Sequence, residues 1–157
     1  TSGAGRAKGR MRLFLHPQTA LARGWTEEVQ TFFSSSEGRK RAAVFKLAFD
    51  DKAAKGALFW ARLRTQVMKT PHGDQGLLIS RFLYEASGGY ADLPLMEDVE
   101  LVRRLGPRRV RILDALAVTS AEKYRRDGYS KRAWRNLWLV SRYLLGADPA
   151  MLAKSYD

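Results

Sequence analysis

The segment from residue 73 to residue 104 constrains the fold of this chain most, because strand and helix patterns alternate within it. Residues 77–79 form a short run of Leu, Leu and Ile, which predicts a buried strand. Residues 81–86 predict one or two helical turns, which end at Gly88 and Gly89. Strands that alternate with helices predict an α/β fold.

A second helix is predicted to begin at residues 96–98, which read Met-Glu-Asp. Its inner face is expected to be apolar, with Leu95, Val99, Val102 and Leu105. Its outer face is expected to be charged, with Glu100, Arg103 and Arg104. Glu97 and Asp98 lie at the predicted N-terminus, where the helix dipole stabilises negative charge. An ionised carboxylate in this place suits a general base, although an acid there also stabilises a helix without any catalytic role.

A second acidic site is predicted at the turn before the strand. Gly73 and Gly76 bracket Asp74 and Gln75, so the backbone there can bend tightly. The side chains of Asp74 and Gln75 are therefore expected to come close to whatever the protein binds.

The rest of the chain completes the prediction of a mixed sheet flanked by helices. We expect strands at residues 13–15, 42–49 and 108–113, helices at residues 25–33, 52–69 and 130–145, and a short final helix from residue 148. Candidate helix caps are Thr26, Asp50-Asp51 and Thr119-Ser120. Residues 1–10 are basic and Gly-rich, and are expected to form a tail or loop.

Size and composition indicate a single domain over residues 1–157, because a 157-residue chain with 45% apolar residues can bury one sizeable core. The sequence has no cysteine, which excludes disulfides and thiolate metal sites. No apolar run approaches the roughly 18 residues that span a bilayer, and the first residues lack the apolar core of a signal peptide. We therefore expect a soluble or peripheral protein of the cytoplasm or of an organelle interior.

The formal net charge of +12 predicts a polyanionic neighbour. Nucleic acid, an anionic membrane surface and a ligand with a diphosphate group all satisfy this prediction, and the charge also serves solubility. The helix at residues 130–145 bears on the choice. Its apolar stripe is expected to comprise Trp134, Leu137, Trp138, Ser141 and Leu145, and arginines flank the stripe. Such a helix suits peripheral membrane contact, but also packing on a sheet or on a partner protein.

Several of these segments carry a resemblance when they are taken in order. GDQ at residues 73–75, GGYADLPLMED at residues 88–98 and the following amphipathic helix ending in Arg-Arg resemble the second half of family 2 glycosyltransferases of the GT-A fold. The bacterial branch of the arsenosugar-biosynthesis type is similar. LFLHPQT at residues 13–19 with Gly24-Trp25, and VTS at residues 118–120 with the segment 123–128, extend the resemblance over nearly the whole chain.

This resemblance implies a GT-A-like mixed sheet and the transfer of a sugar from a nucleotide-diphospho-sugar. It implies Asp98 as the catalytic base with Glu97 beside it, and Asp74 and Gln75 as contacts to the donor sugar or the acceptor. It implies a phosphate-binding group made of Lys123, Arg125 and Arg126, since the forked guanidinium suits phosphate oxygens. The first βαβ units, which bind the nucleoside in this fold, would precede residue 1.

One departure concerns a divalent metal, Mg²⁺ or Mn²⁺, that the resemblance implies. The family places a metal-binding acid just after the first strand, and this chain has Gln18 there. A neutral amide contributes no charge, so metal affinity is expected to fall. His16 is a second candidate ligand, or else a structural hydrogen-bonding residue. Two hypotheses follow: a glycosyltransferase, or an inactive scaffold or subunit of a larger assembly whose basic surface contacts a polyanion such as nucleic acid or lipid.

Overall fold

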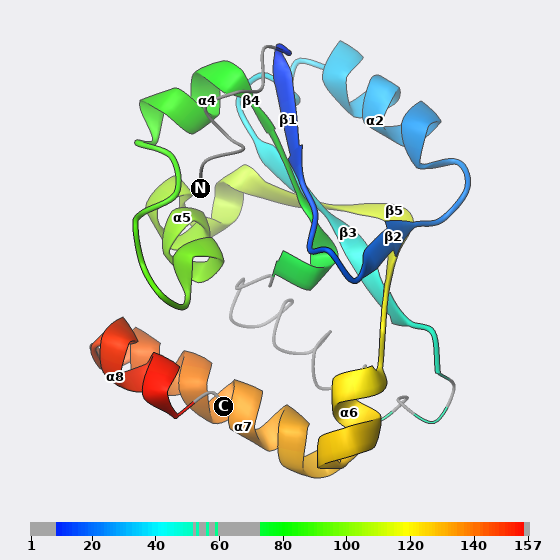
Figure 1. The fold of residues 1–157 in the computed structure, drawn as a ribbon. Coiled ribbons are helices and arrows are strands. Elements are labelled where there is room, and N and C mark those ends of the chain that lie inside the picture. The colour runs from blue at the N-terminus through cyan, green and yellow to red at the C-terminus, as the bar shows by residue number, and fades with distance from the viewer. Residues whose placement is uncertain (1–8, 52, 54–55, 57–58, 60–72, 156–157) are drawn as a thin grey trace.

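The computed structural model describes residues 9–51, 53, 56, 59 and 73–155 (Figure 1). The strands of the described part are β1 (Met11–Phe14), β2 (Thr19–Leu21), β3 (Ala42–Phe49), β4 (Leu77–Ser80) and β5 (Val110–Thr119). Its α-helices are α2 (Trp25–Ser34), α4 (Arg81–Ala86), α5 (Glu97–Leu105), α6 (Glu122–Asp127), α7 (Tyr129–Leu144) and α8 (Pro149–Lys154), and 3-10 turns form η2 (Gly73–Gln75) and η3 (Pro107–Arg109). The predicted α/β class is confirmed.

All five strands form one mixed sheet in the order β1-β4-β3-β5-β2. Only β3 and β5 pair in parallel, and the other three pairings are antiparallel. The parallel ladder is interrupted by a shift of register between Val44 and Lys46. The antiparallel pairing of β1 with β4 sets Phe14 opposite Leu77, so the end of β1 lies beside the start of β4.

Helices cover both faces of this sheet. On one face, Phe32 of α2 packs against a buried cluster that includes Phe45 and Leu78. On the other face, Leu83 of α4 and Leu101 of α5 pack against strand residues of β3 and β4. Both faces are therefore buried, which explains why β3 and β4 read as nearly continuous apolar runs.

A third cluster joins α5 to the C-terminal helices. Val99 of α5, Leu139 and Val140 of α7, and Leu152 of α8 are buried together with Met96. Figure 1 shows α7 and α8 at the opposite end of the molecule from α4, with α5 between them. The N-terminus of α5 is thus held between the sheet and α7.

Most predicted boundaries are confirmed, and three predictions are corrected. β5 is longer than the predicted strand and begins at Val110, because residues 107–109 form η3. Thr26 does not cap α2, whose N-cap is Gly24, and its hydroxyl instead donates to Glu27 at 2.9 Å. Thr119 belongs to β5, and the Ser120 hydroxyl accepts the Glu122 N–H at the start of α6 at 3.2 Å.

The face of α7 that packs inward is also different from the one predicted. Leu139 and Val140 are buried, whereas Trp134 and Trp138 are 63% and 50% exposed and Leu145 is 86% exposed. Apolar residues surround most of this helix, so two stripes compete for the interior. The stripe that contains Leu139 packs against α5 and α8 and is therefore the buried one.

Two predictions lie mainly outside the described residues. One is the helix at residues 52–69, of which only positions 53, 56 and 59 are described, and the other is the tail or loop at residues 1–10, of which only positions 9 and 10 are described. Among the described helices, none is long and apolar enough to cross a lipid bilayer.

Candidate active site

The candidate site lies at the edge of the sheet where β1 and β5 end and β4 begins. The β1–β4 pairing brings His16, two residues after β1, close to Asp74, three residues before β4. The Nδ1 atom of His16 lies 3.8 Å from Oδ1 of Asp74, and both side chains are about one-third exposed. The Thr19 hydroxyl donates to the Thr119 hydroxyl at 3.1 Å, which ties the segment after His16 to the end of β5.

Asp74 is held in place by the η2 turn. Gly76 ends this turn with φ +65°, a left-handed conformation that favours glycine. A Cβ at this position would also lie 2.7 Å from Cδ2 of Leu15 and 3.3 Å from Cδ2 of Phe45. Glycine is therefore required here by both backbone conformation and space, as the sequence predicted for this turn.

Gln75 has a different place from the one predicted. Its side chain is buried, and its Nε2 donates a hydrogen bond to the backbone oxygen of Phe45 at 3.1 Å. Phe45 lies where the β3–β5 register shifts. A shift of this kind disturbs the regular ladder, and the Gln75 amide satisfies the carbonyl there. Gln75 therefore ties the turn to strand β3, and it does not line the cavity that contains Asp74.

Glu97 and Asp98 occupy the first turn of α5. The residue before them, Met96, is buried and has φ +68°, the one non-glycine residue with positive φ in the described part of the chain. Such a conformation costs free energy and often occurs at functional sites. Asp98 accepts the backbone N–H of Val99 at 2.7 Å, and both acids are half-buried.

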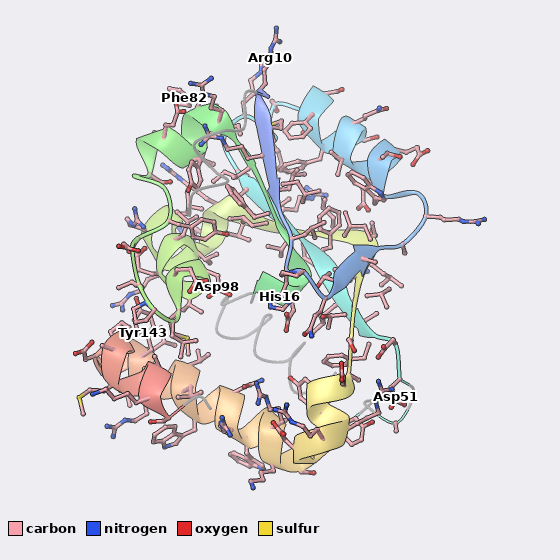
Figure 2. All side chains as sticks on the ribbon, in the orientation of Figure 1. Arg10, His16, Asp51, Phe82, Asp98 and Tyr143 are labelled. Atoms are coloured by element: carbon pink, nitrogen blue, oxygen red, sulfur yellow. The ribbon has the colours of Figure 1, made fainter. Side chains whose placement is uncertain are left out.

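These elements surround one cavity of about 290 Å³. Its lining includes three carboxylates, an amide, an imidazole and one guanidinium: Asp74, Glu97, Asp98, Gln18, His16 and Arg132. Figure 2 shows the labelled Asp98 and His16 in the region between the sheet and α7. The two acidic segments that the sequence singled out, around Asp74 and Asp98, thus lie on a shared cavity.

His16 and Gln18 form the rim beside Asp74. The backbone N–H of Gln18 donates to Nδ1 of His16 at 3.3 Å. When Nδ1 accepts this bond it carries no proton, so its contact with Asp74 is then not an ion pair. The side chain of Gln18 is exposed at the rim.

Among the described residues that line the cavity, Arg132 is the one Lys or Arg, and it was not among the predicted site residues. Its side chain is only 6% exposed, and its Nη1 donates to Oδ2 of Asp127 at 2.8 Å. Nε of Arg126 donates to the other oxygen of the same carboxylate, also at 2.8 Å. Asn136, one helical turn after Arg132, lines the cavity too and donates to the Tyr124 hydroxyl at 3.1 Å.

The predicted phosphate-binding group is not found as a unit at the cavity. Arg125 is half-exposed and lies 3.6 Å from Asp51, and Arg126 is mostly exposed and pairs with Asp127. Neither lines the cavity. Lys123 belongs to α6, and its side chain lies outside what the structure describes. Asp51 also accepts the Ala53 N–H at 2.8 Å, in keeping with the predicted cap.

One further residue behind the acids was missed by the sequence analysis. Burial raises the pKa of the Tyr90 hydroxyl, and the negative charges of Asp98 and Glu97 contribute to the rise. Tyr90 therefore stays protonated at neutral pH and is a neutral group near the two acids. Its backbone N–H donates to the Tyr84 hydroxyl at 3.1 Å. The one signal in the sequence that pointed to Tyr90 is its place directly after Gly88-Gly89.

The pairing of Asp127 with two arginines predicts a change in stability with pH. Arg126, followed by Arg132, lowers the pKa of Asp127 from its ordinary value of 3.8 to about 2. The stabilising contribution is thus present above pH 3.8 and is lost as the pH falls toward 2. We expect Asp127→Asn to be less stable than the wild type near neutral pH, with a difference that shrinks through this window. Urea unfolding of both proteins at a series of pH values measures it, and a constant difference would contradict it.

Comparisons with known proteins add no assignment, since no family model, no curated protein and no solved structure matches this chain. Within the part of the chain that the structure describes, no three His, Cys, Asp or Glu side chains gather into a metal-binding group. The geometry of the cavity is therefore the basis for any proposal of function.

Proposed function

We propose that this chain is a glycosyltransferase-like domain that transfers a sugar from a nucleotide-diphospho-sugar to an acceptor hydroxyl. One observation carries the proposal. The segments that resemble family 2 glycosyltransferases are far apart in the sequence, yet residues 13–19, 73–75, 88–98 and 118–120 each supply at least one residue to the same cavity. A shared cavity is what a common reaction would require of them.

Asp98 is the proposed base. Its carboxylate takes the proton of the acceptor hydroxyl, and the acceptor oxygen forms a bond to the anomeric carbon of the sugar. The bond from that carbon to the phosphate oxygen breaks, and the nucleoside diphosphate leaves with the electron pair. Attack from the face opposite the leaving group inverts the anomeric centre. The position of Asp98 in the first turn of α5 favours the ionised form that can accept a proton.

Arg132 is the proposed contact to the leaving diphosphate. A guanidinium offers several N–H donors to phosphate oxygens, and its charge compensates the charge that develops as the bond breaks. Its ion pair with Asp127 fixes the side chain in the wall of the cavity.

A divalent metal fits this cavity only together with the phosphates of the donor. At the rim near His16, Asp74 is the carboxylate, and Gln18 offers a neutral oxygen. Mg²⁺ is commonly held by one or two carboxylates and by substrate phosphates, so Asp74 and Gln18 are the residues that would hold it. When bound, such an ion would neutralise negative charge on the diphosphate.

A binding experiment tests the proposal through Arg132. A donor panel of uridine, guanosine and thymidine diphospho-sugars is titrated, one compound at a time, into the protein with MgCl₂ or MnCl₂ present. Isothermal titration calorimetry gives the Kd of each. Since a hydrogen bond to a charged group contributes about 1.5–3 kcal/mol, Arg132→Gln is expected to raise the Kd about tenfold or more. Arg126→Gln is the matched control, because it removes a partner of the same Asp127 without altering the cavity. Equal losses for both variants would contradict the role of Arg132.

Gln18 favours a second candidate function, an inactive scaffold or subunit that keeps the cavity without turnover. The residue stands where the resemblance implies a charged metal ligand. Binding of a nucleotide-diphospho-sugar with no release of nucleoside diphosphate, with Gln18→Asp restoring release, would select this candidate. Release by the wild-type chain would exclude it.

A further inference from the structure

The outer face of α7 carries a continuous basic-aromatic stripe, defined here as Lys131, Trp134, Trp138, Arg142 and Leu145. Successive members are three or four residues apart, which places them on one side of the helix. All are exposed, with values of 63% for Trp134, 50% for Trp138 and 86% for Leu145. The stripe lies on the side of α7 away from buried Leu139 and Val140.

Two exposed residues of α8 follow the stripe in the chain. Met151 of α8 is 68% exposed, and Lys154 is exposed as well. The charged residues of the stripe itself are Lys131 and Arg142, and neither α7 nor α8 contains an Asp or Glu. The guanidinium of Arg142 lies 5.6 Å from the ring centroid of Trp138, so cation and ring form one unit.

We propose that this stripe docks on an anionic lipid surface. Tryptophan prefers the boundary between headgroups and acyl chains, and basic side chains reach from the same helix to anionic headgroups. Leu145 and Met151 are apolar side chains that gain nothing from a nucleic acid but lose contact with water on entering a bilayer. The charges of Lys131 and Arg142 complement the negative potential of such a surface.

This orientation places the cavity next to the membrane. Arg132 and Asn136 line the cavity from the other side of the same helix. A helix with its side chains is about 10–12 Å across, so a lipid surface under the stripe lies within roughly one helix diameter of the cavity. The docking itself does not depend on the proposed glycosyl transfer, and the test below uses no activity.

The test measures partition of the full chain onto vesicles in a sedimentation assay at low salt. Vesicles of equal parts phosphatidylcholine and phosphatidylglycerol are expected to bind the wild type, and pure phosphatidylcholine vesicles much less. The double variant Trp134→Ala/Trp138→Ala is expected to lower the partition coefficient by about tenfold or more. Arg142→Gln is expected to lower it about fivefold. Brominated lipids should quench tryptophan fluorescence in the wild type more than in the double variant.

Matched controls come from the far end of the molecule. Phe82 on α4 is an exposed aromatic residue, and Arg10 is an exposed basic residue, both distant from α7 in Figure 2. Phe82→Ala and Arg10→Gln are expected to leave the partition within about twofold of the wild type. A loss from Arg10→Gln equal to that from Arg142→Gln would mean that net charge alone causes binding and would overturn the proposal, as would a loss from Phe82→Ala equal to that from the double tryptophan variant. Lack of vesicle binding would overturn it too, as would a wild-type dimer in sedimentation equilibrium that the double variant abolishes.

Discussion

Asp98→Asn is expected to lower the rate of sugar transfer by about 10²–10⁴-fold, the usual contribution of a positioned general base. The amide has nearly the shape of the carboxylate, but it cannot accept the proton of the acceptor hydroxyl. Its oxygen can still accept the N–H of Val99, which the Asp98 carboxylate does at 2.7 Å. The measurement is the release of nucleoside diphosphate in the presence of acceptor, with the donor panel at saturating concentration.

Two controls separate the base from a general effect of charge. Asp92 is exposed in the same connection between α4 and α5 and does not line the cavity, so Asp92→Asn is expected to keep the wild-type rate within about twofold. Glu97 does line the cavity, and the rate of the Glu97→Gln variant is expected to lie between the rates of Asp98→Asn and Asp92→Asn. Equal rates for the wild type and Asp98→Asn would remove Asp98 from the mechanism. Unchanged thermal unfolding of each variant confirms that the rate reports chemistry.

The sequence predicted the elements around the acids well because local signals determine them. The predicted helical turns at residues 81–86 coincide with α4, and the helix predicted to start at residues 96–98 begins at Glu97. The Ser80 hydroxyl caps α4 by accepting the Leu83 N–H at 3.1 Å. Apolar spacing, short polar caps and glycines are all visible within a few residues of each boundary.

Side chains whose direction depends on distant packing were predicted less well. The sequence indicated a phosphate-binding group on α6, yet the arginine that lines the cavity is Arg132 of α7. Its inward direction follows from the packing of Leu139 and Val140, which share its side of the helix. The stripe through Trp134 and Trp138 was expected to pack inward, which would have turned Arg132 toward solvent. Which of the two apolar stripes is buried depends on packing against α5 and α8, and the local sequence of α7 carries no information about those contacts.

The misplacement of Gln75 has a similar cause. Whether a turn side chain faces solvent, ligand or core depends on which backbone groups nearby need a partner. The need in this case arises from the shift of register at Phe45, which is thirty residues away in the sequence and on another strand. Asp74, one residue earlier, faces the cavity because neighbouring residues of a tight turn point in different directions.

Leu101→Ala is expected to lower the free energy of unfolding by about 2–5 kcal/mol, since it removes a large buried side chain and leaves a cavity. Leu101 is fully buried between α5 and the sheet, in contact with the cluster of Leu77, Ile79 and Leu83. Leu145→Ala is the matched control because the same change is made at a site 86% exposed, and it should cost less than about 0.5 kcal/mol. Urea unfolding of the three proteins gives both differences.

The comparison also tests how the acidic helix is anchored. α5 carries Glu97 and Asp98 at its first turn, and Leu101 lies one turn further along on the face that meets β3 and β4. Loss of that packing loosens the element that holds the proposed base, so the Leu101→Ala variant should also lose activity beyond its unfolded fraction. Equal stability of the Leu101 and Leu145 variants would mean that α5 does not pack on the sheet, and the shared position of Asp74 and Asp98 on one cavity would then have no support.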